Sequence, residues 1–404
     1  MERAFTADLV VVGAGLVGLA TAVSLLERRP DLRLVVVDKE RELASHQSGH
    51  NSGVLHAGLY YQPGSLKARL CREGRAALIA FADEHAIPYR LCGKLVVAVD
   101  ERELSRFAAL ADRGRANGLS VTELEPVEWR RFEPSVSGVR AFHVAESGVI
   151  DFRAVAAAYA EVARRAQAKI LLGQAVRAIE RDGAGCRLRT DNGDIAAGGM
   201  IACAGLQADR VCAMTGDLGD EYRVVPFRGD YYALRNGARE LVSGLVYPVP
   251  DPSFPFLGVH FTRRLDGQLL AGPNAVPALA REGYSRLSLT PRDVADVVGF
   301  PGFRTLARSY ASTGAAEIWR DLVKPAAVAV MRRYLPALRS RDVRFGPVGV
   351  RAQVMSRDGT LVDDFLIHES PHALHVLNAP SPAATASLAI GRHIAERAIA
   401  NFSL

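Results

Sequence analysis

The sequence predicts an α/β protein in which a helix-covered parallel sheet receives an inserted α+β domain built on an antiparallel sheet. The first 40 residues read as strand, turn, helix and strand, and residues after 374 read as a buried strand followed by a helix. Between these ends, 223–234, 257–263 and 268–272 look like antiparallel strands. A chain of 404 residues is too long for one simple core. No repeat or linker divides it, so we expect the second domain to be inserted, not appended.

The first segment, DLVVVGAGLVGLATAVSLLERRPDLRLVVVDKE, organises the rest of the chain. Leu9–Val12 predicts a buried strand, Leu16–Arg28 a helix and Leu34–Val37 a second strand. The G-x-G-x-x-G pattern between strand and helix permits a tight turn, close approach of a pyrophosphate and close helix packing. Asp38 ends the second strand, where a carboxylate accepts hydrogen bonds from a ribose. These features predict a Rossmann-like dinucleotide site.

Two other interpretations of this segment compete with the dinucleotide site. The first is an ordinary βαβ unit with a glycine turn. The second is a membrane span, because Leu9 to Leu26 carries no charge. Eighteen residues barely reach the length needed to cross a bilayer, and a strand pattern follows at once, so we reject the span.

Composition narrows the class of protein. Hydrophobic residues make up 49% of the chain and charged residues 23%, which is typical of a soluble globular protein. The formal charge of +6 comes from scattered basic residues without an aromatic-interleaved stripe, so no nucleic-acid partner is expected. Five cysteines, without C-x-x-C or a His/Cys cluster, indicate a reducing cytoplasm and no metal site. Only Met1–Ala7 precede the first strand, so no leader peptide is expected.

The remaining elements follow from periodicity and capping signals. Helices are expected at Ser65–His85, at Glu101–Asn117, and from the cap Asp151 to about Ala166. Ala295–Tyr334 is expected to be largely helical, with breaks at Pro301-Gly302 and Pro325. Strands are expected at Lys94–Val99, Ile170–Leu172, Ala175–Glu180, Cys186–Thr190, Gly199–Ala204, Val343–Val354, Leu361–His368 and Leu374–Leu377.

The arrangement favours FAD over NAD as the dinucleotide. FAD is longer than one βαβ unit, so distant segments must return to it, as the last strand and helix do here. We expect that helix to begin near Ser381 and to point its first turn, Ala383-Ala384-Thr385, at the flavin pyrimidine, where negative charge develops on reduction. Asp38 keeps NAD as an alternative, because Glu is commoner at this position in flavoproteins.

Two further stretches suit a flat cofactor. The segment ASHQSGHNSGVLHAGLYYQPGSLKARLC is rich in small and polar residues and shows little periodicity before Ser65, which is typical of a functional loop. A surface loop is the plainer alternative. The strand that ends in Cys203-Ala204-Gly205 could place a ring system or diphosphate against small residues, or end in an ordinary glycine turn.

Long motifs over nearly the whole chain resemble those of one family. Besides the loop just described, they are VPFRGDYYAL, VYPVPDPSFPFLGVHFTRRLDG, AGPNAV, REGY, GVRAQ, LVDDF and NAPSPAATASLAIG. They look like those of L-2-hydroxyglutarate dehydrogenases, called oxidases in bacteria, within the D-amino-acid-oxidase-like FAD superfamily. Animal members carry an N-terminal extension that this chain lacks, so it looks like a bacterial form.

The resemblance implies oxidation of L-2-hydroxyglutarate to 2-oxoglutarate, with hydride passing to flavin N5. It implies an FAD-binding domain from 1–87, 146–220 and 345–404, and a substrate-binding domain from 88–145 and 221–344. FAD is expected to be bound non-covalently. The residues expected to contact it are Gly13, Gly15, Gly18, Asp38, Lys39, Ser48, Asn51, Ser52, Gly53, Val176, Ala204, Gly205, Ser381, Ala383, Ala384 and Thr385.

This oxidation requires a base for the hydroxyl proton, and histidine is the natural base near neutral pH. His260 lies on an expected strand of the substrate sheet, and His56 lies in the cofactor loop, so we favour His260 as the base. A purely structural role is as likely for each. Related amine dehydrogenases attach FAD covalently through a histidine in a stretch similar to that of His56. His46 and His50 are interpreted as loop residues.

Arginine binds carboxylates through two parallel hydrogen bonds, so the substrate's two carboxylates point to Arg228 and Arg351. The alternative for these arginines is a structural salt bridge, to Asp230 or to Asp363-Asp364. Tyr232, with Tyr60 and Tyr61, is expected to close the pocket or donate to a carboxylate. Lys67 is interpreted as a charge on a helix surface.

Three functional alternatives remain open: oxidation of an N-methyl amino acid, oxidation of another 2-hydroxy acid, and a dinucleotide-binding scaffold without turnover. The electron acceptor is expected to be oxygen or a quinone. A cluster of arginines follows the apolar run Ala326–Met331, and it predicts either peripheral contact with the cytoplasmic face of the inner membrane or a solvated helix face. Its members are Arg332, Arg333, Arg339, Arg341 and Arg344.

Overall fold

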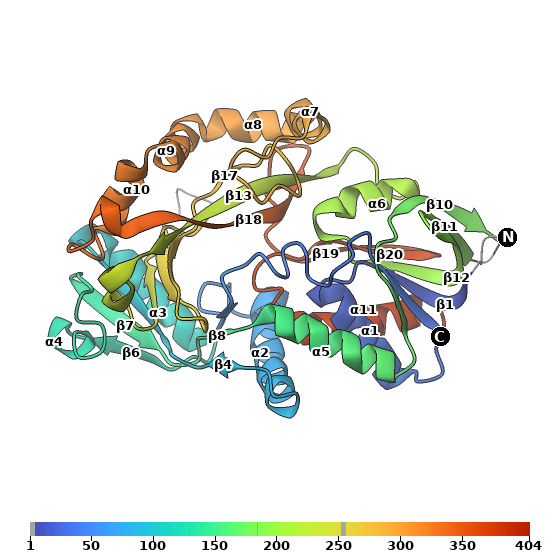
Figure 1. The fold of residues 1–404 in the computed structure, drawn as a ribbon, viewed down its shortest axis with the longest axis horizontal. Helices are drawn as coiled ribbons and strands as arrows, with labels where there is room; N and C mark the ends of the chain where they lie inside the picture. Colours follow the sequence, from blue (N-terminus) through green and yellow to red (C-terminus); the bar gives the residue numbers. More distant parts are fainter. Residues whose placement is uncertain (1–4, 184, 252–255) are drawn as a thin grey trace.

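The computed structural model describes residues 5–183, 185–251 and 256–404, and it contains two large sheets that lie side by side (Figure 1). The first, on the right of the view, has eight strands in the order β10-β11-β12-β1-β2-β9, with β20 beside β12 and β19 beside β20. β1 runs parallel to both β2 and β12. The strands are β1 (Phe5–Val12), β2 (Leu34–Val37), β9 (Lys169–Leu171), β10 (Val176–Asp182), β11 (Gly185–Thr190), β12 (Gly193–Ala202), β19 (Leu366–Ser370) and β20 (Ala373–Asn378).

Helices cover both faces of this sheet, so β1 is apolar on both sides. Leu9 and Val11 pack toward the helices below the sheet in Figure 1, and Val10 and Val12 pack toward β11 and α6. This confirms the predicted βαβ unit and the fold class. The lower helices are α1 (Leu16–Arg28), α2 (Leu66–Glu84), α5 (Phe152–Arg165) and α11 (Ser387–Asn401), and α6 (Ala208–Met214) lies above.

Side-chain caps begin two of these helices where the sequence predicts them. Asp151 Oδ1 accepts hydrogen bonds from the backbone N–H groups of Arg153 and Ala154 at the start of α5. Ser65 Oγ accepts one from the N–H of Ala68 at the start of α2. A three-stranded sheet of β3 (Val54–Leu55), β8 (Gly148–Ile150) and β4 (Tyr89–Arg90) holds the loop between β2 and α2.

The second sheet has nine strands and is mainly antiparallel. Its order is β17-β13-β16-β15-β14-β5-β7-β6, with β18 paired to β13. α3 (Leu104–Ala116) and α10 (Lys324–Met331) pack against it through two separate apolar clusters. The strands are β5 (Lys94–Ala98), β6 (Val121–Leu124), β7 (Arg140–Val144), β13 (Tyr222–Leu234), β14 (Leu245–Pro248), β15 (His260–Arg263), β16 (Leu269–Gly272), β17 (Val276–Pro277) and β18 (Val343–Ser356).

One expected domain boundary crosses a strand. The boundary at residue 345 assigns most of β18 to the first domain, but β18 pairs with β13 along nearly its whole length in the second sheet. The pairing places apolar side chains of both strands in shared clusters, so β18 belongs with this sheet. The domain boundaries otherwise stay a prediction.

The C-terminal segment differs from its prediction at two places. The final helix α11 begins at Ser387, because residues 381–386 form turns in place of the expected first helical turn. The strand expected at Leu361–His368 is shorter and later, since β19 spans Leu366–Ser370 and Leu361 makes only an isolated bridge to Met355.

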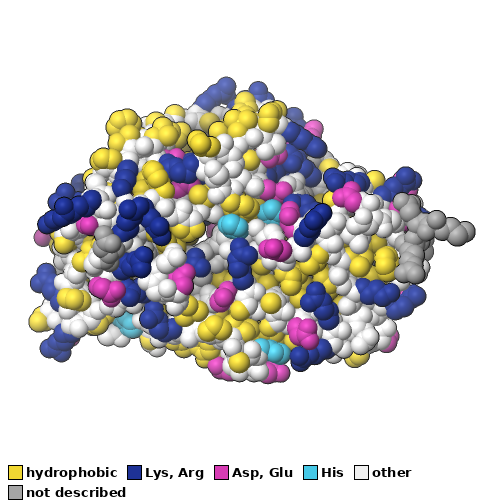
Figure 2. Space-filling model, in the orientation of Figure 1, with side chains coloured by type: hydrophobic (Ala, Val, Ile, Leu, Met, Phe, Trp, Pro, Cys, Tyr) yellow, Lys and Arg dark blue, Asp and Glu magenta, His cyan; other side chains and the backbone are white. Residues whose placement is uncertain are grey.

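Four helices form an arc along the rim of the second sheet (Figure 1). The predicted breaks at Pro301 and Pro325 separate the first helix from the second and the third from the fourth, and a break at Tyr310, which was not predicted, separates the second from the third. Basic and acidic side chains are interspersed over the face shown in Figure 2, and hydrophobic side chains lie along the arc. Among the described helices, none is both long and apolar enough to span a bilayer. The arc comprises α7 (Pro291–Gly299), α8 (Pro301–Ser309), α9 (Ala311–Leu322) and α10.

Candidate active site

A cavity of about 1200 Å³ is lined by residues of both sheets and of the loops that follow their strands. At one end it is lined by the turn after β1 and by residues that follow β2 and β12, and at the other end by side chains of β13, β14, β15 and β18. Sites for small ligands usually measure about 300–1,000 Å³, so this cavity suits a long ligand with a second, smaller one beside it.

The glycine turn lies at the first end. Gly13 adopts φ +111°, and a Cβ on Gly18 would stand 2.0 Å from the Gly13 carbonyl oxygen, so both positions require glycine. A Cβ on Gly15 would meet only Ser48 Oγ, at 3.0 Å, and the rest of its surroundings open into the cavity. This is the close backbone approach that a pyrophosphate needs.

Asp38 and Ser48 fasten the turn. Asp38 accepts hydrogen bonds from the N–H of Ala14 at 2.7 Å and from the N–H of Glu40 at 2.8 Å. Ser48 Oγ accepts one from the N–H of Leu16 at 3.0 Å, in the first turn of α1. The loop therefore crosses the N-terminus of α1, where an anionic group is favoured.

Most of the residues expected to contact the cofactor line this cavity, although their role stays a prediction. Thr385 lies behind the wall, where its hydroxyl accepts a hydrogen bond from the N–H of His56 and donates one to the Val54 carbonyl. Gly53 also lies outside the lining, at φ +73° in the loop. The lining members are Gly13, Gly15, Asp38, Lys39, Ser48, Asn51, Ser52, Val176, Ala204, Gly205, Ser381, Ala383 and Ala384.

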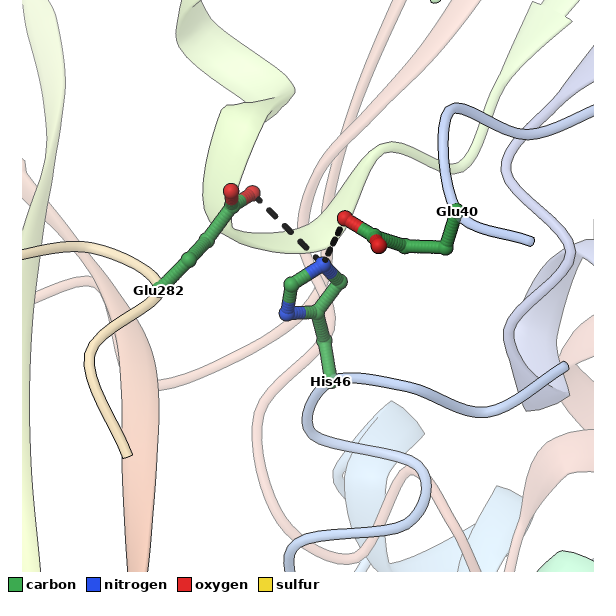
Figure 3. Close-up of side chains that lie close together, drawn as sticks. All are labelled: Glu40, His46 and Glu282. Carbon is green, nitrogen blue, oxygen red and sulfur yellow. Dashed lines mark hydrogen bonds and ion pairs between the residues drawn. The ribbon is translucent and has the colours of Figure 1, made fainter. Parts of the chain in front are cut away.

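A charged cluster lies at the rim of the nucleotide end. Glu40, His46 and Glu282 point toward one another (Figure 3), with ligand atoms close enough to hold a metal ion. The ammonium of Lys39, however, lies 2.9 Å from Glu282 Oε2 and 3.1 Å from His46 Nε2, and it also contacts Glu40. The ammonium of Lys39 already contacts both carboxylates and the histidine, so we assign no metal here.

At the other end of the cavity His260 is buried against the ring of Tyr247, with ring centroids 4.1 Å apart. Its Nδ1 lies 3.0 Å from the Gly258 carbonyl, which can only accept, so Nδ1 carries the proton and Nε2 is free to take one. Burial lowers the pKa of His260 to about 3, and the charges of Lys94 and Arg351 act in the same direction. The imidazole is therefore neutral at pH 7.

His56 lines the same end of the cavity. Burial lowers its pKa well below the ordinary value, and the charge of Lys94 acts in the same direction. The structure thus brings the two candidate bases together, but only His260 lies on a strand of the substrate sheet.

Arg351, on β18, points into the cavity as expected for a carboxylate ligand. Its guanidinium lies 5.4 Å from the centroid of the Phe256 ring and donates a 3.5 Å hydrogen bond to the Asn274 carbonyl. Within the described ranges no carboxylate pairs with it, and burial lowers its pKa. A half-buried arginine that has no carboxylate partner is a ready partner for an anion.

Arg228 and Tyr232 do not line the cavity. Arg228 Nε lies 3.0 Å from Asp230, as the salt-bridge alternative expects, and its Nη2 lies 2.6 Å from Asp321. Side chains alternate along β13, so Arg228 and Tyr232 face the arc of helices while Gly229 and Tyr231 face the cavity. Because Tyr231 lies two residues after Gly229 on the same face of the strand, this alternation would have predicted Tyr231 as the tyrosine that faces the cavity.

Two other residues of the cavity wall were not predicted from the sequence as part of the site. Lys67 is buried and not a surface charge, with its ammonium 2.9 Å from Asp363 Oδ1 and 5.1 Å from the centroid of the Tyr61 ring. Tyr247 comes from β14; it is the second residue of the motif VYPVPDPSFPFLGVHFTRRLDG, but no role was assigned to it there. Burial of Lys67 depends on the distant segment around Asp363, so no local signal could have found it.

A glycine turn on a parallel sheet, a long cavity and a neutral histidine on an adjoining antiparallel sheet define a dinucleotide-dependent oxidoreductase. The model of the family described as FAD dependent oxidoreductase matches residues 8–397. An L-2-hydroxyglutarate dehydrogenase of Indibacter alkaliphilus is 42% identical over 98% of this chain and 99% of its own. One of Escherichia coli strain K12 is 40% identical over 96% of this chain and 92% of its own.

Solved structures agree on the fold. An L-α-glycerophosphate oxidase of Mycoplasma pneumoniae with FAD bound has a TM-score of 0.78 at 22% identity, over 99% of this chain and 95% of its own. Glycine oxidase of Geobacillus kaustophilus has a TM-score of 0.72 at 20% identity, over 97% and 95%. The chain therefore belongs to the FAD-dependent oxidoreductases and, among them, to the L-2-hydroxyglutarate dehydrogenase family. FAD is its cofactor, and the glycine turn fits it.

Proposed function

We propose that the protein oxidises L-2-hydroxyglutarate to 2-oxoglutarate. The observation that carries this proposal is that two groups line the same end of the cavity: a half-buried arginine with no carboxylate partner among the described residues, and a neutral histidine whose Nε2 is free. Relatives named for this substrate are 40–44% identical over nearly the whole chain, which supports the same choice.

The chain's own residues divide the work of binding and proton removal. Arg351 binds one carboxylate of the substrate through two hydrogen bonds, and Lys67 with Tyr61 receives the other. His260 takes the hydroxyl proton at Nε2, while its Nδ1–H bond to Gly258 and the ring of Tyr247 hold the imidazole in place. The dianionic substrate raises the low basicity of the buried imidazole, because a nearby negative charge favours the protonated form. FAD, when bound, accepts the hydride.

The proposal includes an electron acceptor, which is oxygen or a quinone. It also includes peripheral contact of the protein with a membrane. The predicted arginine cluster offers charge alone, because Tyr334, Leu335 and Leu338 are buried and Arg333 pairs with Asp100 and Glu103. The helix α9 instead exposes three large apolar side chains on one face, Ile318, Trp319 and Leu322. Such an exposed apolar face suits the boundary of a bilayer.

Anaerobic reduction of the purified yellow protein tests the function. L-2-hydroxyglutarate should bleach the flavin absorbance, whereas D-2-hydroxyglutarate and sarcosine should leave it unchanged. Oxygen or a quinone analogue, added afterwards in separate samples, identifies the acceptor by the rate of reoxidation. Bleaching by sarcosine alone would transfer the proposal to an amine substrate.

A further inference from the structure

Lys94, on β5, is a buried cation that the oxidation just described does not use. Its side chain is 1% exposed, and its ammonium lies 4.2 Å from the centroid of the Tyr247 ring and 5.2 Å from that of Tyr60. In the part of the chain that the structure describes, no carboxylate forms an ion pair with it. Two aromatic faces stabilise a cation only partly, so burial of this charge is costly.

The ionisable groups around Lys94 supply no compensating negative charge. Burial raises the pKa of the Cys71 thiol to about 12 and also raises that of Cys92. His56 and His260 have lowered pKa values, and the pKa of the Tyr60 phenol is raised well above its ordinary value. Burial also raises the pKa of the Tyr247 phenol. All six groups are neutral at pH 7, so none of them supplies a counter-charge for Lys94.

Lys94 stands directly behind one end of the cavity. Tyr60, Tyr247, His56 and His260 all line that end, and Lys94 contacts or acts on each of them from the far side. Charge acts over longer distances in an apolar surrounding than in water, so its field extends through this wall into the cavity.

We propose that Lys94 is a positioning residue for an anionic substrate, whose carboxylates supply the counter-charge that the chain itself lacks. This inference deepens the proposed function and rests on it for the identity of the anion. The charge of Lys94 has a second effect, because it disfavours protonation of His260 until the anion binds.

The pH at which Lys94 loses its proton makes the inference testable. Burial lowers the pKa of Lys94 to about 8. Below that pH the lysine is charged and attracts the anion, and above it the attraction is lost. The affinity of the wild-type protein for a dicarboxylate should therefore fall as the pH rises through about 8, while His260 stays neutral throughout.

The experiment measures binding of glutarate, an unreactive dicarboxylate, to the FAD-loaded protein through the change in flavin absorbance between pH 6 and pH 9.5. Lys94→Met should bind glutarate about tenfold more weakly at pH 7 and show no fall near pH 8. Lys94→Arg should bind as the wild type does at pH 7 and also lose the fall, because arginine stays charged. Lys169→Met is the matched control, since exposed Lys169 lies 5.1 Å from the Phe5 ring, in the other sheet.

The variant also has a stability readout. Removing a buried charge without a partner should leave the melting temperature of Lys94→Met no lower than that of the wild type. If Lys94→Met does not fold, Lys94→Arg provides the test. If the affinity of Lys94→Arg for glutarate still falls near pH 8, another group is responsible for the titration and the inference is overturned. Glutarate binding by Lys94→Met equal to the wild type at every pH overturns it as well.

Failure of this inference and failure of the proposed function give different results. If L-2-hydroxyglutarate does not reduce the wild-type flavin but Lys94→Met still weakens glutarate binding, the function fails and the role of Lys94 stands. If the wild type is reduced normally and Lys94→Met binds glutarate unchanged, the role of Lys94 fails and the function stands.

Discussion

Glu282 Oε2 lies 2.9 Å from the ammonium of Lys39, and this contact ties the loop after β17 to the loop after β2 across the nucleotide end of the cavity. Three neighbouring contacts strengthen the tie. Gln207 Nε2 donates to Glu282 Oε1 at 2.8 Å, the Tyr284 hydroxyl lies 2.9 Å from His46 Nδ1, and the Tyr284 ring stacks on His50 with centroids 3.8 Å apart.

We predict that this tie retains FAD. Glu282→Ala should raise the dissociation constant of FAD about fivefold, since a partly exposed charged contact of this kind contributes about 1 kcal/mol. The measurement is flavin fluorescence during reconstitution of the apoprotein. Glu240→Ala is the control, because Glu240 pairs with Arg263 away from the cavity. Equal affinity in both variants would contradict the prediction.

The glycine turn gives a second prediction. Gly15→Val should yield folded protein that is largely free of flavin, because the branched side chain would crowd Ser48 Oγ and fill the space that the pyrophosphate needs. The ratio of flavin to protein absorbance measures this. Gly219→Val should keep its colour, because a Cβ added at Gly219 would meet no atom within 4 Å. Full colour in Gly15→Val would remove this loop from the cofactor site.

A third prediction separates the two histidines. His260→Ala should keep FAD but be reduced by L-2-hydroxyglutarate about 10²–10⁴-fold more slowly, with partial recovery as the pH rises. Since burial lowers the pKa of His260 to about 3, the reduction rate constant of the wild type at low substrate should show no acidic limb from this group between pH 5 and pH 8. Stopped-flow reduction at several pH values measures both.

His56→Ala should instead change the flavin spectrum or its retention, because the variant removes an imidazole that lines the cavity next to the cofactor loop. Acid precipitation of the wild type should release all FAD into the supernatant, as expected for non-covalent binding. Normal reduction of His260→Ala, together with loss of only the chemical step in His56→Ala, would reverse the two assignments.

A fourth prediction contrasts two arginines of neighbouring strands. Arg228→Met should lower the free energy of unfolding by about 3 kcal/mol, because it removes the nearer of the two arginines that pair with Asp230 and Asp321 and leaves these buried carboxylates with Arg286 alone. Arg351→Met should leave stability nearly unchanged and weaken glutarate binding about tenfold or more. Urea unfolding and flavin titration distinguish the two. If only Arg351→Met lost stability, the structural role would belong to Arg351 and the prediction would be wrong.

A fifth prediction concerns the exposed face of α9. The double variant Trp319→Ser, Leu322→Ser should sediment less with anionic vesicles at low salt than the wild type does, because it removes the two most exposed apolar side chains of that helix. Val127→Ser, an equally exposed residue on α4 (Pro126–Trp129), is the control. A wild type that never sediments with vesicles would end the membrane proposal.

Local sequence alone determined the parts of this protein that depend on neighbours in the chain. The βαβ unit, the cap Asp151 and the breaks at two prolines were all predicted where they occur, because period, capping and proline chemistry act within a few residues. The long motifs likewise determined the family, since their residues are individually improbable.

Tertiary structure alone decided which side chains meet. It turned Tyr231 toward the cavity and Arg228 toward Asp321, 93 residues away, because the pairing of β13 sets which face of that strand is buried. It also buried Lys94 behind two tyrosines from other elements. Such contacts depend on packing between segments far apart in the chain, and no local pattern carries that information.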